Sequence, residues 1–321
     1  MNRILVTGAN GQIGSELTRA LRDRHTADSV VGFDLQAPGA ANGQPPTRPH
    51  VVGDVRNRDL LDDTVETYDI GTVYHLASLL SATGEKQPDR AWDVNLGGLK
   101  NVLDLARTHD LAVFWPSSIA VFGPSTPKHN TPQQTVLDPA TMYGVTKRSG
   151  ELLCRYYHRR YGVDVRSLRY PGLISHTTPP GGGTTDYAVD MFYAAAQDQS
   201  YTCFVRPDTC LPMMYMPDAL RATLALMNAD ADALTVRDSY NVAAMSFRAD
   251  ALEAHIQRHL PAFACTYEPD DRQEIADAWP STIDDSTARA DWNWSPTYDL
   301  ASMTDDMLAH LREGEEVRGK R

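Results

Sequence analysis

The chain has few cysteines, and their spacing suits no shared task. Only four of its 321 residues are cysteine, Cys154, Cys203, Cys210 and Cys265, and no two of them form a CxxC pair. A disulfide framework or a zinc ribbon needs a denser and more regular cysteine pattern. The sequence therefore predicts reduced thiols packed in the interior, and it predicts no metal site.

Long apolar runs and an excess of basic residues are also missing. No stretch approaches the roughly 20 apolar residues that a membrane-spanning helix needs. The 42 Asp and Glu residues outnumber the 30 Lys and Arg residues, for a net charge of −12, which argues against a nucleic-acid partner. The first expected strand starts at Arg3, which leaves no space before it for a signal or transit peptide. We therefore expect no membrane partner and a cytoplasmic location.

The chain does contain a regular alternation of short apolar strands and amphipathic helices. Helical spacing is visible over 15–24 and 91–109. Strands are expected at 3–7, 30–33, 51–55, 72–77, 111–116 and 163–169. Such alternation predicts an α/β fold with a Rossmann-type, doubly wound parallel sheet. Ligands of this fold bind at the carboxyl ends of the strands.

A glycine-rich turn follows the first strand. Residues 7–14 read T-G-A-N-G-Q-I-G between that strand and a helix. In this context Gly8 and Gly11 let the backbone approach a pyrophosphate, and Gly14 lets the helix pack on the strand. Free amides at the helix start then face the phosphates. An ordinary tight turn is the weaker alternative, so the pattern predicts a dinucleotide cofactor.

Two acidic residues that end the next strands bear on the choice of cofactor. Asp34 lies about 20 residues beyond the last glycine, where a carboxylate that binds the ribose hydroxyls is expected. Leu35 and Gln36 follow it, with no adjacent basic residue to neutralise a 2′-phosphate, so NAD is favoured over NADP. Asp54 suits either the adenine amino group or the cap of the next helix, and both interpretations stay open.

The pair Tyr143 and Lys147 is the strongest catalytic signal. Four residues apart on a helix, the two lie on one face, where an ammonium can bring a phenol pKa of about 10 toward neutrality. By itself YxxxK also fits a solvated helical face, but Ser118 and the segment 169–172 are expected at the same edge of the sheet. His75 lies in an apolar strand and is better interpreted as a hydrogen-bonded core residue than as a catalyst.

Beyond residue 170 the alternation weakens. We expect a dinucleotide-binding Rossmann domain from 1–170, with a later contribution from about 212–243, and a smaller C-terminal substrate domain from 171–211 and 244–312. Residues 36–49 are typical of a surface loop. Residues 179–187 predict a mobile loop that opens a helix, with Thr185 or Asp186 as a possible cap. The charged tail 313–321 is expected to be disordered.

Together the motifs resemble the extended short-chain dehydrogenase/reductase superfamily over almost the whole chain. They are the glycine turn, Ser118, Y-G-V-T-K at 143–147 and R-Y-P-G at 169–172. Within it the chain is similar to the short-chain type of L-threonine 3-dehydrogenases. That similarity rests on longer strings, which include Y-H-L-A-S-L-L-S at 74–81, P-P-G-G-G-T-T-D-Y-A at 179–188 and W-P-S-T-I-D-D-S at 279–286. Residues 36–50 match nothing in that pattern.

The resemblance implies roles for individual residues. Tyr143 would be the general base, Lys147 its partner and ribose anchor, and Ser118 the donor to the reacting oxygen. The amino-acid pocket would consist of Ser81, Ser118, Tyr143, Thr184, Thr185, Asp186 and Trp279. NAD would contact Gly8, Asn10, Gly11, Gln12, Ile13, Gly14, Asp34, Leu35, Asp54, Val55, Leu76, Ala77, Ser78, Asn95, Tyr143, Lys147, Tyr170, Leu173 and Ile174.

The resemblance also implies a reaction and an assembly. The reaction would be NAD-dependent oxidation of L-threonine at C3 to 2-amino-3-ketobutyrate, without a metal. The assembly would be a homodimer that pairs the helices around 95–106 and 143–157. Two alternatives remain: a nucleotide-sugar epimerase or dehydratase, which needs a larger and more basic site for a diphosphate, and an NAD-sensing protein without turnover.

Overall fold

A computed structural model describes residues 3–38, 49–178 and 181–319, with side chains up to residue 313. Residues 39–48 of the expected surface loop lie outside the described residues. So do 179–180 at the start of the expected mobile loop, and 320–321. In the part of the chain that the structure describes, no helix has the length and apolar character needed to cross a membrane.

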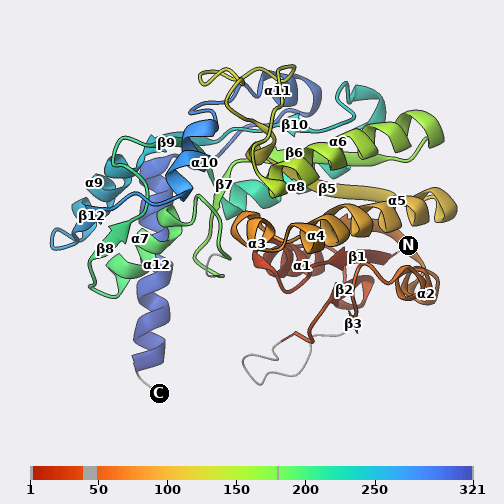
Figure 1. The fold of residues 1–321 in the computed structure, drawn as a ribbon. Coiled ribbons are helices and arrows are strands. Elements are labelled where there is room, and N and C mark those ends of the chain that lie inside the picture. Colours follow the sequence, from red (N-terminus) through yellow and green to blue (C-terminus); the bar gives the residue numbers. More distant parts are fainter. Residues whose placement is uncertain (1–2, 39–48, 179–180, 320–321) are drawn as a thin grey trace.

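Seven parallel strands form the central sheet (Figure 1). In pairing order they are β10 (Tyr240–Asn241), β6 (Val165–Tyr170), β5 (Ala112–Ser118), β4 (Ile70–His75), β1 (Arg3–Thr7), β2 (Val30–Asp34) and β3 (His50–Val52). The order reverses between β1 and β4, which opens a crevice at the carboxyl ends of the strands. The expected Rossmann-type α/β fold is confirmed.

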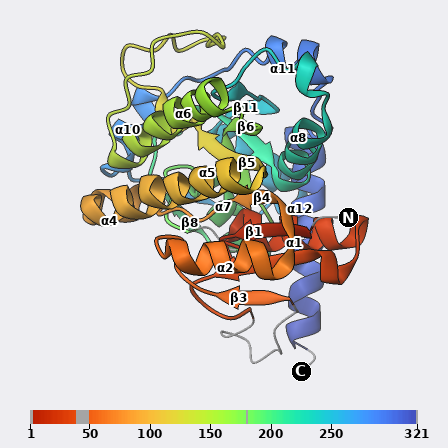
Figure 2. The same cartoon turned by 90° about the vertical axis from the view of Figure 1, so that its right-hand side faces the viewer.

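Helices cover both faces of this sheet (Figure 2). One face carries α1 (Gln12–Arg24), α8 (Met216–Asn228) and α11 (Ser286–Trp292), and the other carries α2 (Arg58–Tyr68), α5 (Gly98–His109) and α6 (Met142–Tyr161). Neighbouring residues of β1 point to opposite faces, so Val6 joins the first core and Leu5 joins the second. Burial on both faces explains why the strands read as continuous apolar runs.

A smaller lobe lies beyond the carboxyl ends of the central strands. Its sheets are β11 (Met245–Arg248), β9 (Cys210–Tyr215) and β7 (Gly172–Ile174), and the pair β12 (Cys265–Tyr267) and β8 (Tyr201–Cys203). Its helices are α7 (Tyr187–Ala196), α9 (Ala249–His259), α10 (Arg272–Ala278) and α12 (Leu300–Gly319). A separate apolar core holds this lobe together. Within residues 212–243, β10 joins the large sheet and α8 packs on one face of it, while the end of β9 belongs to the three-stranded sheet of the small lobe.

Short helical elements connect these parts. They are η1 (Ala27–Ser29), α3 (Ser81–Lys86), α4 (Pro88–Trp92), η2 (Asp93–Gly97), η3 (Ile119–Val121) and η4 (Ala231–Ala233). The single helix expected over 91–109 is therefore interrupted, because η2 is a π-helical turn between α4 and α5. The sequence carries no local signal for such a turn, which often marks a functional site.

The last helix extends into the C-terminal tail. The sequence predicts disorder from residue 313, but α12 continues to Gly319. Three of the seven residues at 313–319 are Glu, which has high helix propensity. The described part of the tail thus continues α12, and the expectation of disorder from residue 313 stays a prediction.

Candidate active site

The glycine turn between β1 and α1 is shaped by close backbone contacts. Gly8 has φ +70°, and a Cβ added to it would lie 2.8 Å from the Ala77 amide nitrogen. A Cβ on Gly14 would lie 2.0 Å from the Gly8 carbonyl oxygen. Only glycine fits these two positions, because a side chain would displace backbone atoms. The turn therefore leaves the helix amides open to an approaching phosphate, as a dinucleotide requires.

A cavity of about 390 Å³ lies beside this turn, where an adenosine is expected. Its lining residues are Gly8, Asn10, Gly11, Phe33, Asp34, Leu35, Gln36, Gly53, Asp54, Val55, Leu76, Ala77, Ser78, Leu79, Arg90 and Val94. Asp34 Oδ2 accepts a hydrogen bond from the Asn10 amide at 2.9 Å, so the carboxylate also fixes the turn. The sequence interpretation missed Arg90, because α4 is far from Asp34 in the chain.

Asp54 is held by a basic neighbour. Arg56 Nη2 donates to Asp54 Oδ2 at 2.7 Å, and these hydrogen bonds lower the Asp54 pKa. Helix α2 is capped by Asn57, whose side chain accepts from the Leu60 amide at 3.2 Å. Of the two interpretations left open for Asp54, capping is therefore wrong, and the residue lines the cavity together with Val55.

A second cavity, of about 150 Å³, gathers the predicted catalytic and amino-acid-binding residues. Ser81, Ser118, Tyr143, Lys147, Thr184, Thr185, Asp186 and Trp279 all line it. So do Gln12, Ile13, Leu76, Ser78, Leu80, Pro116, Ser117, Ile119, Tyr170, Pro171, Gly172, Leu173 and Gly183. Leu76 and Ser78 line both cavities, so the two adjoin. Among the predicted contacts, Gly14, Asn95 and Ile174 line neither cavity.

Helix α6 begins where it can deliver Tyr143 to Ser118. Thr141 caps the helix by accepting from the Gly144 amide at 3.0 Å. A Cβ on Gly144 would lie 2.2 Å from the Ala120 carbonyl oxygen, so glycine lets the helix start pack against the turn after Ser118. The Ser118 hydroxyl lies close enough to the Tyr143 phenol to lower its pKa. The local sequence thus determines the serine–tyrosine contact.

Burial controls the protonation of the predicted catalytic pair, Tyr143 and Lys147. It raises the pKa of Tyr143 to about 12, although the nearby Ser118 hydroxyl acts in the opposite direction. It lowers the pKa of Lys147 to about 7. Lys147 Nζ donates to the Pro116 carbonyl oxygen at 2.7 Å and lies 5.4 Å from the centroid of the Tyr143 ring. The expected fall of the phenol pKa toward neutrality is not seen here, because the loss of water on burial is the dominant influence on the phenol.

A buried ion pair fixes α6 against the sheet. Arg169 Nε and Nη2 donate to the two carboxylate oxygens of Glu151 at 2.8 and 3.0 Å. Ser117 Oγ donates to Glu151 Oε1 at 2.7 Å, and Arg169 Nη1 donates to Asn241 Oδ1 at 3.0 Å. Arg169 of the R-Y-P-G string therefore supports the site, while Tyr170, Pro171 and Gly172 line the cavity.

Asn95 lies in the π-helical turn and supports the same region. Its Oδ1 accepts from the Leu79 amide at 2.7 Å. Its Nδ2 donates to the Leu79 carbonyl oxygen and to Thr146 Oγ1, each at 3.1 Å. The side chain thus ties the loop after β4 to α6, which explains why it does not line a cavity.

Two further expectations about single residues can be compared with the structure. His75 is 1% exposed and its Nδ1 lies 2.7 Å from Thr7 Oγ1, so the interpretation as a hydrogen-bonded core residue is confirmed.

Asp186 makes no side-chain cap for α7. Instead its Oδ2 accepts from the Gly182 and Gly183 amides at 2.7 and 2.5 Å and closes the glycine loop on itself. The capping interpretation of Asp186 is therefore wrong.

Comparisons with known proteins agree with this geometry. The family model described as "NAD dependent epimerase/dehydratase family" matches residues 4–243. An uncharacterized epimerase/dehydratase of Staphylococcus haemolyticus is 50% identical over 98% of this chain and 99% of its own length. A GalE-like L-threonine dehydrogenase from Cupriavidus necator, in its holo form, has TM-score 0.93 and 55% identity over 96% of this chain and 99% of that chain. A monomeric L-threonine 3-dehydrogenase from a metagenome database, in its apo form, has TM-score 0.93 and 48% identity, and the match covers 97% of this chain and 99% of that chain.

Proposed function

The chain belongs to the NAD dependent epimerase/dehydratase family, and within it we propose that the protein oxidises L-threonine at C3 with NAD⁺, giving 2-amino-3-ketobutyrate and NADH. One observation carries the proposal. The predicted catalytic residues Ser118, Tyr143 and Lys147 line a single cavity of about 150 Å³ together with the polar residues expected to bind an amino acid. That cavity adjoins the larger cavity in which adenosine is expected. Several hydroxyl groups and one carboxylate converge on this cavity, as a small zwitterionic substrate requires.

The residues fit a dinucleotide. The glycine turn, Asp34 and the wall formed by Leu76, Ala77 and Ser78 would hold NAD along the crevice between β1 and β4. When bound, NAD⁺ supplies the hydride acceptor for C3. Asp34 favours the free 2′-hydroxyl of NAD because its carboxylate would repel a 2′-phosphate.

Tyr143 is the proposed general base. Its phenol oxygen would take the proton of the threonine hydroxyl, while the Ser118 hydroxyl holds the same oxygen by a hydrogen bond. Lys147 is fixed by the Pro116 carbonyl oxygen, and its pKa of about 7 lets it exchange a proton near neutral pH. Because burial opposes the phenolate, the proton-accepting form of Tyr143 becomes more abundant as the pH rises.

The zwitterionic part of threonine would meet the opposite wall of the cavity. Ser81, Thr184 and Thr185 supply hydroxyl groups for the carboxylate. Asp186 Oδ2 already accepts from two glycine amides, which leaves Oδ1 for the substrate ammonium. Burial raises the pKa of Asp186, and an ammonium beside it would favour the charged carboxylate.

A substrate panel tests this function. The absorbance of NADH is followed after the protein is mixed with NAD⁺ and threonine, with other hydroxy-amino acids, and with UDP-sugars. NADP⁺ replaces NAD⁺ in a parallel series. Rapid reduction of NAD⁺ with threonine alone, and slow reduction of NADP⁺, is expected. Turnover of a UDP-sugar without threonine oxidation would favour the epimerase, and binding of NAD⁺ without any turnover would favour the sensing protein.

A further inference from the structure

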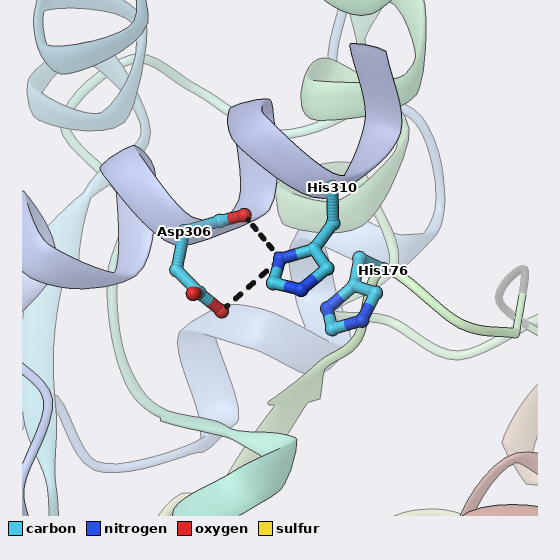
Figure 3. A group of neighbouring side chains, drawn as sticks. All are labelled: His176, Asp306 and His310. Atoms are coloured by element: carbon cyan, nitrogen blue, oxygen red, sulfur yellow. Dashed lines mark hydrogen bonds and ion pairs between the residues drawn. The ribbon is translucent and has the colours of Figure 1, made fainter. Parts of the chain in front are cut away.

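Two histidines and an aspartate meet in the small lobe, apart from the site described above. His176 follows β7, while Asp306 and His310 lie one turn apart on α12. Figure 3 shows the three side chains gathered between these two segments. One possible ligand atom from each residue lies within 4.8 Å of the other two. None of the three residues lines either cavity, so the proposed function leaves them without a role.

We propose that His176, Asp306 and His310 bind a divalent transition-metal ion, with Zn²⁺ as the best match. Two imidazole nitrogens and one carboxylate oxygen form a ligand set that zinc uses, with water in the fourth position. The sequence predicts no metal because that expectation rests on cysteine spacing. It could not reveal a site that joins residue 176 to residues 306 and 310.

The hydrogen bonds around the two rings leave a lone pair on each. His310 Nδ1 lies 2.9 Å from the Asp306 backbone oxygen, and a carbonyl only accepts, so Nδ1 carries the proton. The Tyr215 hydroxyl donates to Asp306 Oδ2 at 2.6 Å, so its oxygen accepts from His176 Nδ1 at 2.7 Å. In both neutral rings Nε2 is therefore the free ligand atom. Oxygen partners at the other nitrogen are typical of metal-binding histidines.

The rings must turn before they can share an ion. Their centroids are 4.1 Å apart and their planes differ by 14°, so their lone pairs point in nearly parallel directions. An ion shared by both rings therefore requires a rotation about χ2, a torsion with a broad energy profile in histidine, and this rotation weakens the Nδ1 hydrogen bonds to Tyr215 and to the Asp306 carbonyl oxygen. The side chains of His310 and Asp306 are 47% and 31% exposed, so an ion can reach the group from solvent.

A bound ion would link two parts of the small lobe. His176 belongs to the segment that leads from β7, which lines the small cavity, toward the glycine loop closed by Asp186. The adjacent Ser175 Oγ donates to Glu16 Oε1 of α1 at 2.5 Å. The ion would therefore fasten α12 to the root of that loop without entering the cavity.

A second group offers a matched control. Asp62 and Glu66 of α2 lie near His109 of α5, but this group has one imidazole, and its Nε2 is 2.7 Å from Asp62 Oδ1. That nitrogen is already used in an ion pair, and two carboxylates suit harder cations than zinc. His109→Ala thus removes a surface histidine–carboxylate pair and leaves the proposed site intact.

The test is calorimetric titration of the full-length, untagged protein with ZnCl₂, together with melting curves. The wild type and His109→Ala should bind one equivalent at micromolar affinity and melt at a higher temperature with Zn²⁺. His310→Ala and Asp306→Asn should bind about tenfold more weakly or worse, since loss even of an outer partner has that effect. Asp306→Asn keeps an acceptor for Tyr215, which guards against misfolding. The proposal would be overturned if the wild type shows no micromolar binding of Zn²⁺, or if both site variants bind Zn²⁺ with the affinity of the wild type.

Discussion

Tyr143 and Lys147 show how burial changes the meaning of a motif. In the sequence the pair suggests a phenol tuned by an ammonium, but in the fold both groups lose water. The pKa of the phenol rises to about 12 and that of the ammonium falls to about 7. Both shifts favour the neutral forms, because a low-dielectric interior penalises either charge. Chemistry at this pair should therefore be strongly dependent on pH.

Tyr143→Phe tests the proton acceptor. The substitution removes the phenol oxygen and keeps the ring, so threonine oxidation should fall by about 10²–10⁴-fold. Cofactor affinity should change little, and titration with NAD⁺ is the control. In the wild type, initial rates should rise from neutral to alkaline pH. A variant that keeps more than a few per cent of the activity would remove Tyr143 from the mechanism.

Lys147→Met tests the buried ammonium through stability. Between about pH 7 and pH 10.5 the unfolded lysine holds a proton that the buried lysine lacks, so this group makes wild-type stability rise with pH over that window. Methionine has no such titration. The melting temperature of the variant minus that of the wild type should therefore be largest near pH 7 and should decrease toward pH 10. A difference that stays constant over this range would show that Lys147 titrates normally.

At the scale of the element, the glycine loop before α7 is better defined than its sequence suggests. Three glycines predict backbone freedom, but the Asp186 carboxylate accepts from two of their amides. Thr184 is 3% exposed, and Thr185 contacts the region of Gly172, where an added Cβ would lie 2.8 Å from Thr185 Cβ. Residues 183–186 of the loop therefore form one side of the small cavity and are held there by hydrogen bonds and close packing.

Thr185→Ala tests that wall. Loss of a hydroxyl that bonds to a charged carboxylate costs about 1.5–3 kcal/mol, so the KM for threonine should rise roughly 10–100-fold. The dissociation constant for NAD⁺ should stay nearly the same. Thr185→Ser is the matched control, since it keeps the hydroxyl and should keep most of the affinity. If the alanine variant has wild-type kinetics for threonine, the hydroxyl does not touch the substrate.

What the sequence could predict follows from the range of the interactions. The central strands, the glycine turn and the α6 pair depend on local patterns and on the rule that ligands bind at strand ends. The π-helical turn at 93–97 holds Asn95, whose side-chain amide donates to the Leu79 carbonyl oxygen, and Arg90 of α4 lines the same cavity as Asp34. Such contacts join distant segments, so no local spacing announces them.

At the scale of the whole molecule, α4 and α6 expose apolar side chains. Trp92, Val145, Leu152 and Tyr156 are 49%, 37%, 41% and 52% exposed, and the two helices are in contact. The apolar residues of α5, such as Leu99 and Leu103, are instead buried in the core of their own subunit. Of the two helices expected to form the dimer surface, α6 thus has apolar side chains free to contact a second subunit, whereas those of α5 are used within the chain. On α6, Val145, Leu152 and Tyr156 are seven and four residues apart and so share one helix face, which is a candidate interaction surface.

Light scattering tests the assembly. We expect a dimer at micromolar concentration that uses the face formed by Trp92, Leu152 and Tyr156. Leu152→Glu should convert the dimer to a monomer. Because the Leu152 side chain is exposed, the melting temperature should not fall as it does when a core residue is replaced. A monomer mass for the wild type would exclude this dimer.

A deuterium label at C3 follows the proposed hydride transfer directly. The wild type is incubated with NAD⁺ and L-threonine that carries deuterium at C3, and the reduced cofactor is analysed by mass spectrometry. The expected result is NADH that contains one deuterium, together with 2-amino-3-ketobutyrate that has lost it. Label that remains in threonine, or that reaches neither the cofactor nor the keto product, would contradict oxidation at C3.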